Sequence, residues 1–326
     1  MTKDELLSLL WQNADTYISG EELARRLSVS RTAVWKAIGQ LREAGYNIES
    51  VSNRGYRLLS ESDVLSEEGI RRHLKHQELK LQVYKTITST NTVLKTLAAE
   101  GAPAGLALIA GEQTAGRGRM GRSFYSPADS GLYLSLLLRP NVSAVEATRL
   151  TACAAVAAAQ TIEELSGRPA QIKWVNDIFV DGRKVCGILT EASVDCENGM
   201  MHYVIIGLGV NTHVPAGDFP EELRGIAGAA FDADSIPELR CRLAAGILDR
   251  LAEYTENPRA PRVFEAYKRR SLVLGKAINI LAPGRDPVPA EVLDLEEDYA
   301  LLVRLPDGST TRLNSGEVSV RVDDKH

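Results

Sequence analysis

The feature that most constrains this chain is a short loop at residues 116–122, with the sequence GRGRMGR. Apolar segments lie on both sides of it, at residues 106–110 and 131–138, and are typical of buried strands. The loop should therefore lie between two strands of a rigid sheet. Glycine permits positive φ angles, and arginine supplies planar guanidinium donors. The pattern predicts a loop that wraps an anion. The alternative is a solvated basic loop or nucleic-acid tract, although such tracts are usually repeated.

Length and charge narrow the class of protein. The chain has 326 residues, 44% of them hydrophobic, and a net charge of −5. It is long enough for two or three domains, and any contact with nucleic acid must be local because the whole chain is acidic. The first residues carry acids where a signal peptide would carry positive charge, and no apolar run reaches membrane-spanning length. We therefore expect a cytoplasmic protein that makes no contact with membranes.

Cysteine spacing gives no indication of a metal site. The four cysteines (Cys153, Cys186, Cys196 and Cys241) include no CxxC pair, and the five histidines are scattered. Structural metal sites use closely spaced pairs of such ligands. We expect reduced thiols and no metal site formed by the protein itself.

Residues 1–62 are typical of a winged helix-turn-helix domain. Ser19 and Ser30 can cap two short helices, and the turn at residues 53–55 predicts a hairpin after them. Eight basic residues balance eight acidic ones in this segment, but residues 23–42 contain five basic residues and no acid. Local basicity favours contacts with DNA phosphates. The predicted DNA-binding residues are Arg31, Thr32, Trp35, Lys36 and Arg54. A helical module for binding another protein is the alternative.

Two further domains follow. Residues 63–270 alternate helices with strands and predict an α/β domain, and residues 271–326 contain short strands that predict a small β-barrel. Residues 171–180 are predicted to form one extended strand, with Lys173 and Asp177 on one face. Charges in the middle of a strand indicate a cavity, or else an ion pair at a sheet edge. Ser89, Thr90 and Asn91 either cap a helix or line a pocket.

The functional groups of the central domain favour chemistry on negative charge. The sequence contains no GxxxxGK[ST] loop, and no Ser/His/Asp arrangement is readable. It offers instead the arginines of the loop, Lys173, Lys184 and one nearby carboxylate, Asp177. Several fixed cations can bring two anions together, as when a carboxylate attacks a phosphoryl group.

Four motifs occur in a fixed order along this central domain. They are the loop at residues 116–122, KWVND at 173–177, Lys184 with GIL at 187–189, and GLGVN at 207–211. In this order and spacing they resemble the motifs of the biotin-protein ligases. With a winged helix before them and a small β-domain after them, the whole chain is similar to the bifunctional ligases that also repress the biotin operon.

The resemblance implies a fold and two half-reactions. The fold is α+β, with a winged helix-turn-helix, an α/β ligase domain whose mixed sheet is like that of class II synthetases, and an SH3-like barrel. Biotin and ATP, with Mg²⁺ carried by the nucleotide, would give biotinyl-5'-adenylate and pyrophosphate. The adenylate would then acylate a lysine on the biotin carboxyl carrier protein of acetyl-CoA carboxylase. As corepressor, it would also promote a homodimer that binds operator DNA.

The resemblance also assigns residues to roles. The catalytic residues are Arg117, Arg119, Lys184 and Asp177, the last orienting or deprotonating the acceptor amine. The biotin-binding residues are Ser89, Thr90, Asn91, Gln113, Gly116, Arg117, Gly118, Arg119 and Lys184. The ATP-binding residues are Arg119, Arg122, Phe124, Lys173, Asn176 and Asn211. Two positions depart from the family pattern, with Val175 where proline is usual and Phe124 where tryptophan is frequent.

Two rival functions are compatible with parts of this pattern. A lipoate-type ligase would use the same catalytic architecture, but the loop with three arginines and the DNA-binding module disfavour it. A repressor that senses a small anion without catalysis would keep the winged helix and the anion site. Labelled ATP, biotin and carrier protein would separate all three.

Overall fold

The computed structural model describes residues 3–59, 63–140, 142–143, 146–194, 200–232, 236–282, 285–314 and 319–322. Contacts within the chain divide it into two compact units, one from residues 1–75 and 233–245 and the other from residues 76–232 and 246–326. Within the described residues, no helix combines the length and the apolar character needed to cross a membrane. The domain boundaries at residues 62 and 270 stay predictions.

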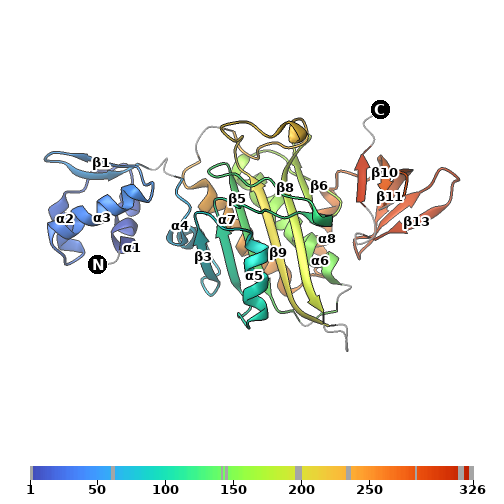
Figure 1. Ribbon diagram of the computed structural model, residues 1–326, viewed down its shortest axis with the longest axis horizontal. Helices are drawn as coiled ribbons and strands as arrows, with labels where there is room; N and C mark the ends of the chain where they lie inside the picture. Colours follow the sequence, from blue (N-terminus) through green and yellow to red (C-terminus); the bar gives the residue numbers. More distant parts are fainter. Residues whose placement is uncertain are drawn as a thin grey trace. The chain divides into compact units, whose positions relative to one another are not determined.

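The first unit contains the predicted winged helix-turn-helix (Figure 1). Its elements are α1 (Lys3–Gln12), α2 (Gly20–Arg26), α3 (Arg31–Glu43), β1 (Ile48–Val51), β2 (Gly55–Leu58) and α4 (Glu67–His73). The hydroxyl groups of Ser19 and Ser30 accept hydrogen bonds from the amides of Glu22 and Ala33, both at 3.1 Å, so the two predicted caps are confirmed. Helix α3 turns its apolar side inward, where Val34, Ile38 and Leu41 are buried.

A partly buried carboxylate lies on α4. The Oε2 atom of Glu68 is buried without a hydrogen-bond partner among the described residues. Burial, helped by the negative charges of Asp4 and Glu238, raises the pKa of Glu68 from 4.5 to about 7, against the opposing charges of Arg72 and Lys3. Because the folded state takes up this proton more readily than the unfolded chain, its contribution to stability is fully present below pH 4.5. It is lost as the pH rises through about 7.

Replacing Glu68 with Gln should therefore stabilise the protein in a pH-dependent way. Glutamine cannot ionise, so the variant should have a higher melting temperature than the wild type at pH 8, and the difference should close near pH 4.5. Glu67→Gln is the matched control, because Glu67 is exposed and ion-paired with Arg71 on the same helix. Equal melting temperatures of Glu68→Gln and the wild type at both pH values would show that Glu68 is not held in a protonated state.

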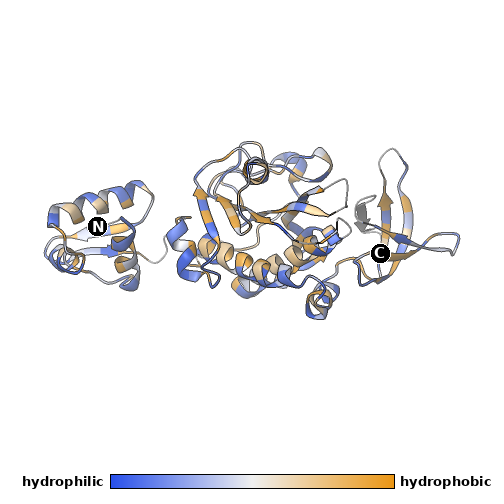
Figure 2. Ribbon diagram, turned by 90° about the horizontal axis from the view of Figure 1, so that it is seen from below, coloured by the Kyte–Doolittle hydropathy of each residue, from blue (hydrophilic) through white to orange (hydrophobic). Residues whose placement is uncertain are grey.

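The second unit is built on a seven-stranded mixed sheet. Its strands are β3 (Lys80–Tyr84), β4 (Leu106–Ala110), β5 (Gly131–Leu138), β6 (Gln171–Lys173), β7 (Asp177–Val180), β8 (Arg183–Val194) and β9 (Met201–Asn211). Their order in the sheet is β3-β4-β5-β9-β8-β7-β6, and only the β3–β4 pair is parallel. The central strands are largely hydrophobic in Figure 2, as expected of strands covered on both faces.

Helices cover both faces of this sheet. Helix α5 (Thr90–Ala99) packs on β4, β5 and β9, and α6 (Ala147–Ser166) packs on β6 to β9. They lie on opposite faces, with α5 in front in Figure 1. The alternation of side chains along β8 supports this placement on opposite faces. Thr190 bonds to Thr151 of α6, whereas the next residue, Glu191, bonds to Asn91 of α5. The remaining helical elements are α7 (Leu239–Glu256), α8 (Pro261–Arg269) and the short η1 (Arg119–Gly121) and η3 (Glu221–Leu223).

The C-terminal part of this unit is a second, smaller sheet. Its strands are β10 (Ala277–Leu281), β11 (Val288–Leu295), β12 (Leu301–Arg304), β13 (Thr310–Leu313) and β14 (Ser319–Val322). All neighbouring pairs are antiparallel, in the order β13-β12-β11-β10-β14. The α+β fold is therefore confirmed in its three parts: a winged helix-turn-helix, a mixed-sheet domain and a small β-domain.

One prediction about the central domain is wrong. Residues 171–180 do not form one strand but a tight hairpin, in which β6 and β7 pair with Lys173 opposite Asp177. Residues 174–176 make the turn, so the side chains do not simply alternate between two faces. Asp177 forms an ion pair with Lys184 on the next strand, at 2.7 Å. The turn contains none of the glycine or proline signals that mark most hairpins.

Candidate functional site

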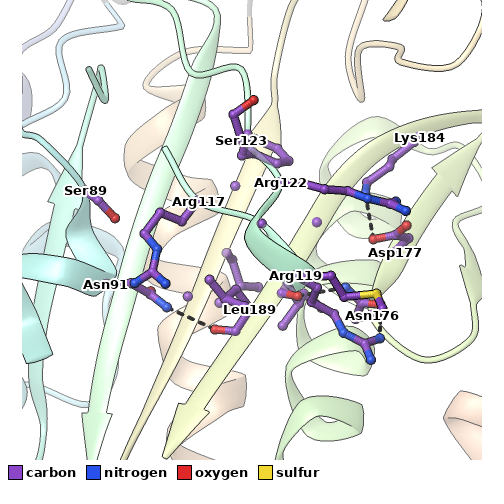
Figure 3. A pocket seen from close by; sticks show the side chains of 18 of the residues that line it. Ser89, Asn91, Arg117, Arg119, Arg122, Ser123, Asn176, Asp177, Lys184 and Leu189 are labelled. Atoms are coloured by element: carbon purple, nitrogen blue, oxygen red, sulfur yellow. Dashed lines mark hydrogen bonds and ion pairs between the residues drawn. The ribbon is translucent and has the colours of Figure 1, made fainter. Parts of the chain in front are cut away.

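A cavity of about 250 Å³ lies on the α5 face of the central sheet. The loop at residues 116–122, the hairpin turn at 174–176 and strands β8 and β9 all border it (Figure 3). Its lining residues are Ser89, Thr90, Asn91, Gln113, Arg117, Gly118, Arg119, Met120, Arg122, Ser123, Phe124, Lys173, Trp174, Asn176, Asp177, Lys184, Gly187, Ile188, Leu189, Gly207, Leu208, Gly209 and Leu281.

The floor of the cavity is made of glycines. Gly187 and Gly209 are directly paired on β8 and β9, and Gly207 lies two residues along β9 on the same face. A Cβ atom at Gly207 would lie 1.9 Å from Oδ1 of Asn91, and one at Gly209 would lie 2.5 Å from the ring of Phe124. These positions therefore require glycine for the close approach of other groups.

One end of the cavity is a hydrogen-bond network of uncharged hydroxyl and amide side chains, which we call the neutral network, and the carboxylate of Glu191 adjoins it through Asn91. The hydroxyl of Ser135 donates towards Thr90 at 2.7 Å and Asn91 at 2.6 Å, and the Asn91 amide donates to the carbonyl of Leu189 at 3.2 Å. Gln113 accepts a bond from the amide of Thr90 at 2.9 Å. Ser89 caps α5, accepting from the amide of Thr92. The two alternatives for residues 89–91 therefore coexist, since they begin a helix and also line the cavity.

The arginine loop is an ordered, folded-back segment. The amide of Gly118 donates to the carbonyl of Arg122 at 2.7 Å, and the amide of Phe124 donates to the carbonyl of Gly116 at 3.0 Å. Met120 and Gly121 have φ angles of 56° and 73°, as the turn requires. This geometry differs from that of a solvated arginine-glycine tract. It brings all three arginines of the loop to the cavity.

Four cationic side chains and one carboxylate gather at the other end. The cations are those of Arg119, Arg122, Lys173 and Lys184, whereas Arg117 lies nearer Asn91, where it pairs with Glu191 (Figure 3). The Nζ atom of Lys184 lies 2.7 Å from Oδ1 of Asp177, and both side chains are partly buried. The guanidinium of Arg119 donates to Oδ1 of Asn176 at 3.1 Å, and burial lowers the pKa of Arg119 below its usual value. An anion placed here would meet positive charge sheltered from water, where attraction is strengthened.

The cavity brings together most of the residues predicted for biotin, ATP and catalysis. Two predicted residues are not in its lining. Gly116 is the first residue of the loop, where a Cβ atom would be 2.4 Å from the carbonyl oxygen of Phe124, and Asn211 donates its side-chain amide to the carbonyl of Gly228 at 3.2 Å. The individual binding and catalytic roles of all these residues stay predictions.

Sequence reasoning missed several residues at this site. Glu191 accepts from Asn91 at 3.0 Å and pairs with Arg117 at 3.2 Å. Its position, two residues after Leu189 on β8, was a readable signal, because alternate residues share a face. Ser135 was also readable, as a polar residue within an apolar strand. Leu281 comes from the C-terminal sheet, and nothing in the sequence indicates its place here.

The first unit carries a separate groove on the winged helix. Arg31, Thr32 and Trp35 line it together with the hairpin residues 50–53. The side chain of Trp35 is 65% exposed, which is unusual for so large an apolar group. Lys36 is exposed on the same helix, and the guanidinium of Arg54 lies 5.8 Å from the centre of the Tyr17 ring. The groove therefore gathers three of the five predicted DNA-binding residues.

Family models match all three parts of the chain. The model of the biotin/lipoate A/B protein ligase family matches residues 83–211, which hold most of the cavity residues. A helix-turn-helix domain model matches residues 2–57, and the model of the biotin protein ligase C-terminal domain matches residues 273–321.

Individual relatives agree with these matches. The bifunctional ligase/repressor BirA of Bacillus subtilis is 42% identical over 233 residues, which cover 71% of this chain and 71% of that protein. The biotin–[acetyl-CoA-carboxylase] ligase of Mycobacterium tuberculosis is 31% identical and covers 73% of this chain and 88% of that protein. The solved biotin protein ligase of Aquifex aeolicus in complex with biotin and ATP has a TM-score of 0.60 at 27% identity, covering 75% of this chain and 99% of that one. The chain therefore belongs to the biotin protein ligase family and is a homologue of the bifunctional ligase/repressors.

Proposed function

We propose that this protein activates biotin with ATP to biotinyl-5'-adenylate, transfers the biotinyl group to a lysine of the biotin carboxyl carrier protein, and represses biotin synthesis genes. The observation that carries the enzymatic part is the polarity of the cavity. A neutral hydrogen-bond network at one end suits the uncharged ureido ring of biotin, and a cluster of cations at the other suits a carboxylate and a phosphate.

In the first half-reaction the biotin carboxylate attacks the α-phosphorus of ATP, and pyrophosphate leaves. Two anions must approach each other, so neighbouring positive charges reduce the repulsion and stabilise the charge that builds up on the phosphoryl oxygens. Arg119 and Lys184 line the cavity and belong to its cationic end, and Arg117 lines it nearer Asn91. The glycine floor leaves room for the chain of biotin to pass close to the sheet.

In the second half-reaction a lysine amine of the carrier attacks the acyl carbon, and AMP leaves with its electron pair. The amine must give up a proton, and Asp177 is the carboxylate in the described cavity lining that could accept it. Its ion pair with Lys184 would keep it oriented between the two steps. Mg²⁺ would arrive with ATP, and since the described lining offers one carboxylate, we expect the triphosphate to supply most of its ligands.

Incubating the full chain with ATP, biotin and purified carrier protein tests this proposal. Mass spectrometry should show a carrier protein heavier by one biotinyl group, formed only when all three substrates are present. Lipoate in place of biotin tests the lipoate-ligase alternative. Binding of biotin and ATP without any modified carrier would support a sensor that lacks catalysis.

The repressor part rests on the winged helix and on the bifunctional relatives. We propose that bound adenylate favours a homodimer and that the dimer binds operator DNA through the two recognition helices. Linkage requires that a ligand which favours the dimer is itself bound more tightly by the dimer. The carrier protein and the operator would both meet the protein in the cytoplasm, where we place it. Operator affinity should then rise when biotin and ATP are added, and a footprinting titration would measure this.

Removal of one DNA-facing charge should reduce the salt dependence of binding. Lys36 is exposed on α3 beside the groove, and a lysine that neutralises one phosphate contributes about 0.9 to the slope of log K against log salt concentration. Lys36→Ala should make this negative slope less steep by about that amount, measured on a random-sequence duplex. Arg71→Ala removes a charge from α4 as the control. An unchanged slope for Lys36→Ala would place the DNA on another surface.

A further inference from the structure

The hairpin turn beside the cavity is attached to the C-terminal sheet by a buried hydrogen bond. The indole Nε1 of Trp174 donates to the main-chain carbonyl of Tyr299 at 2.8 Å. The two side chains are 4% and 1% exposed, so water does not compete for this bond. Trp174 belongs to the turn at 174–176, and Tyr299 lies between β11 and β12. A residue remote in sequence thus fixes a turn that borders the cavity.

Tyr299 is itself rigidly held. Its amide donates to the carbonyl of Glu296 at 2.8 Å, and its φ angle of 66° is one that a non-glycine residue rarely adopts. Its ring packs edge-to-face on Phe264 and Tyr267 of α8, with ring centres 5.6 and 5.1 Å apart. The carbonyl that receives the indole bond therefore has a well-defined position.

The other side of the turn reaches the arginine loop. Asn176 follows Trp174 by two residues, and its side-chain amide donates to the carbonyl of Ile188 at 2.8 Å while its Oδ1 accepts from Arg119 at 3.1 Å. Asp177 follows directly and pairs with Lys184. A chain of contacts thus runs from the C-terminal sheet, through the turn, to the charged groups at the cationic end.

We propose that Tyr299 is a positioning residue for the reaction, and that through Trp174 the C-terminal sheet sets the place of Asn176 and Asp177 relative to the arginine loop. This inference rests on the proposed ligase function. The neutral network at residues 89–91 is not attached to the turn by this route. Loss of the indole bond should therefore disturb the chemistry at the phosphate end and leave the binding of biotin alone unaffected.

Trp174→Phe tests the inference because it keeps an aromatic ring and removes only the N–H donor and part of the ring. It should lower kcat for adenylate formation by about tenfold to a hundredfold, since small displacements of reacting groups have effects of this size. The KM for biotin and the biotin Kd should stay at wild-type values. Trp11→Phe is the matched control, because among the described residues the Trp11 Nε1 has no hydrogen-bond partner.

A second variant tests the inference in case Trp174→Phe does not fold. Phe264→Leu loosens the packing around Tyr299 at a residue outside the cavity lining, and it should lower the same kcat by a smaller factor with an unchanged biotin Kd. If a folded Trp174→Phe variant matches Trp11→Phe in kcat, or if both Trp174→Phe and Phe264→Leu change only the melting temperature, the inference is overturned. If the wild type itself forms no adenylate, the proposed function fails instead.

Discussion

Replacing Lys184 with Ala is expected to slow adenylate formation by roughly a hundredfold to a thousandfold, the usual effect of removing one preorganised charge-stabilising group. Lys184 brings a positive charge over the glycine floor, with its Nζ atom within 3.4 Å of the position that a Cβ of Gly187 would take. The rate of biotin-dependent exchange of pyrophosphate into ATP measures this step. Lys80→Ala, at an exposed position of β3, is the control and should exchange at the wild-type rate.

The Lys184 variant also leaves Asp177 without its ion-pair partner, so two effects must be separated. A double variant, Lys184→Ala with Asp177→Asn, removes the unpaired carboxylate as well. If the lost cation is the cause, the double variant should regain thermal stability but remain slow in exchange. Recovery of exchange in the double variant would mean that the stranded carboxylate, and not the missing ammonium group, inhibits the reaction.

Replacing Gly207 with Ala is expected to weaken biotin binding by about a hundredfold. The new Cβ atom would lie 1.9 Å from Oδ1 of Asn91, so this side chain must move and give up its bonds to Ser135 and Leu189. Lost hydrogen bonds and overpacking together cost a few kcal/mol, which corresponds to a factor of this order in Kd. Isothermal titration with biotin alone measures the effect.

The matched control for this variant is Gly217→Ala. Gly217 is exposed outside the cavity lining, and a Cβ atom there would have no neighbour within 4 Å. Gly217→Ala should bind biotin within a few-fold of the wild type. If the biotin affinity falls equally in both alanine variants, crowding of Asn91 is not the reason, and the neutral network does not hold the biotin ring.

Local sequence signals were sufficient for much of the fold. Capping serines placed the helices of the winged domain, and a run of apolar residues on each side of the arginine loop placed β4 and β5. These elements are determined by residues close together in sequence, so their signals are complete within a short window. The cationic end of the cavity was predicted for the same reason, because its charges come from compact motifs.

The parts that sequence could not predict depend on contacts between distant segments. The hairpin at residues 171–180 has no glycine or proline to mark its turn, and the turn is held from outside by Tyr299. Leu281 reaches the cavity from the C-terminal sheet. Tertiary packing determines such features, and they cannot be predicted from local sequence propensity.

A crystal structure of the full chain grown with biotin and ATP tests the central claim most directly, namely that this cavity holds the acyl adenylate between a neutral network and a cluster of cations. The account predicts density for biotinyl-5'-adenylate over Gly207 and Gly209, with its ring at Asn91 and its phosphate within hydrogen-bond distance of Arg119 and Lys184. Density for the ligands at another place, with the loop at residues 116–122 turned away into solvent, would contradict it.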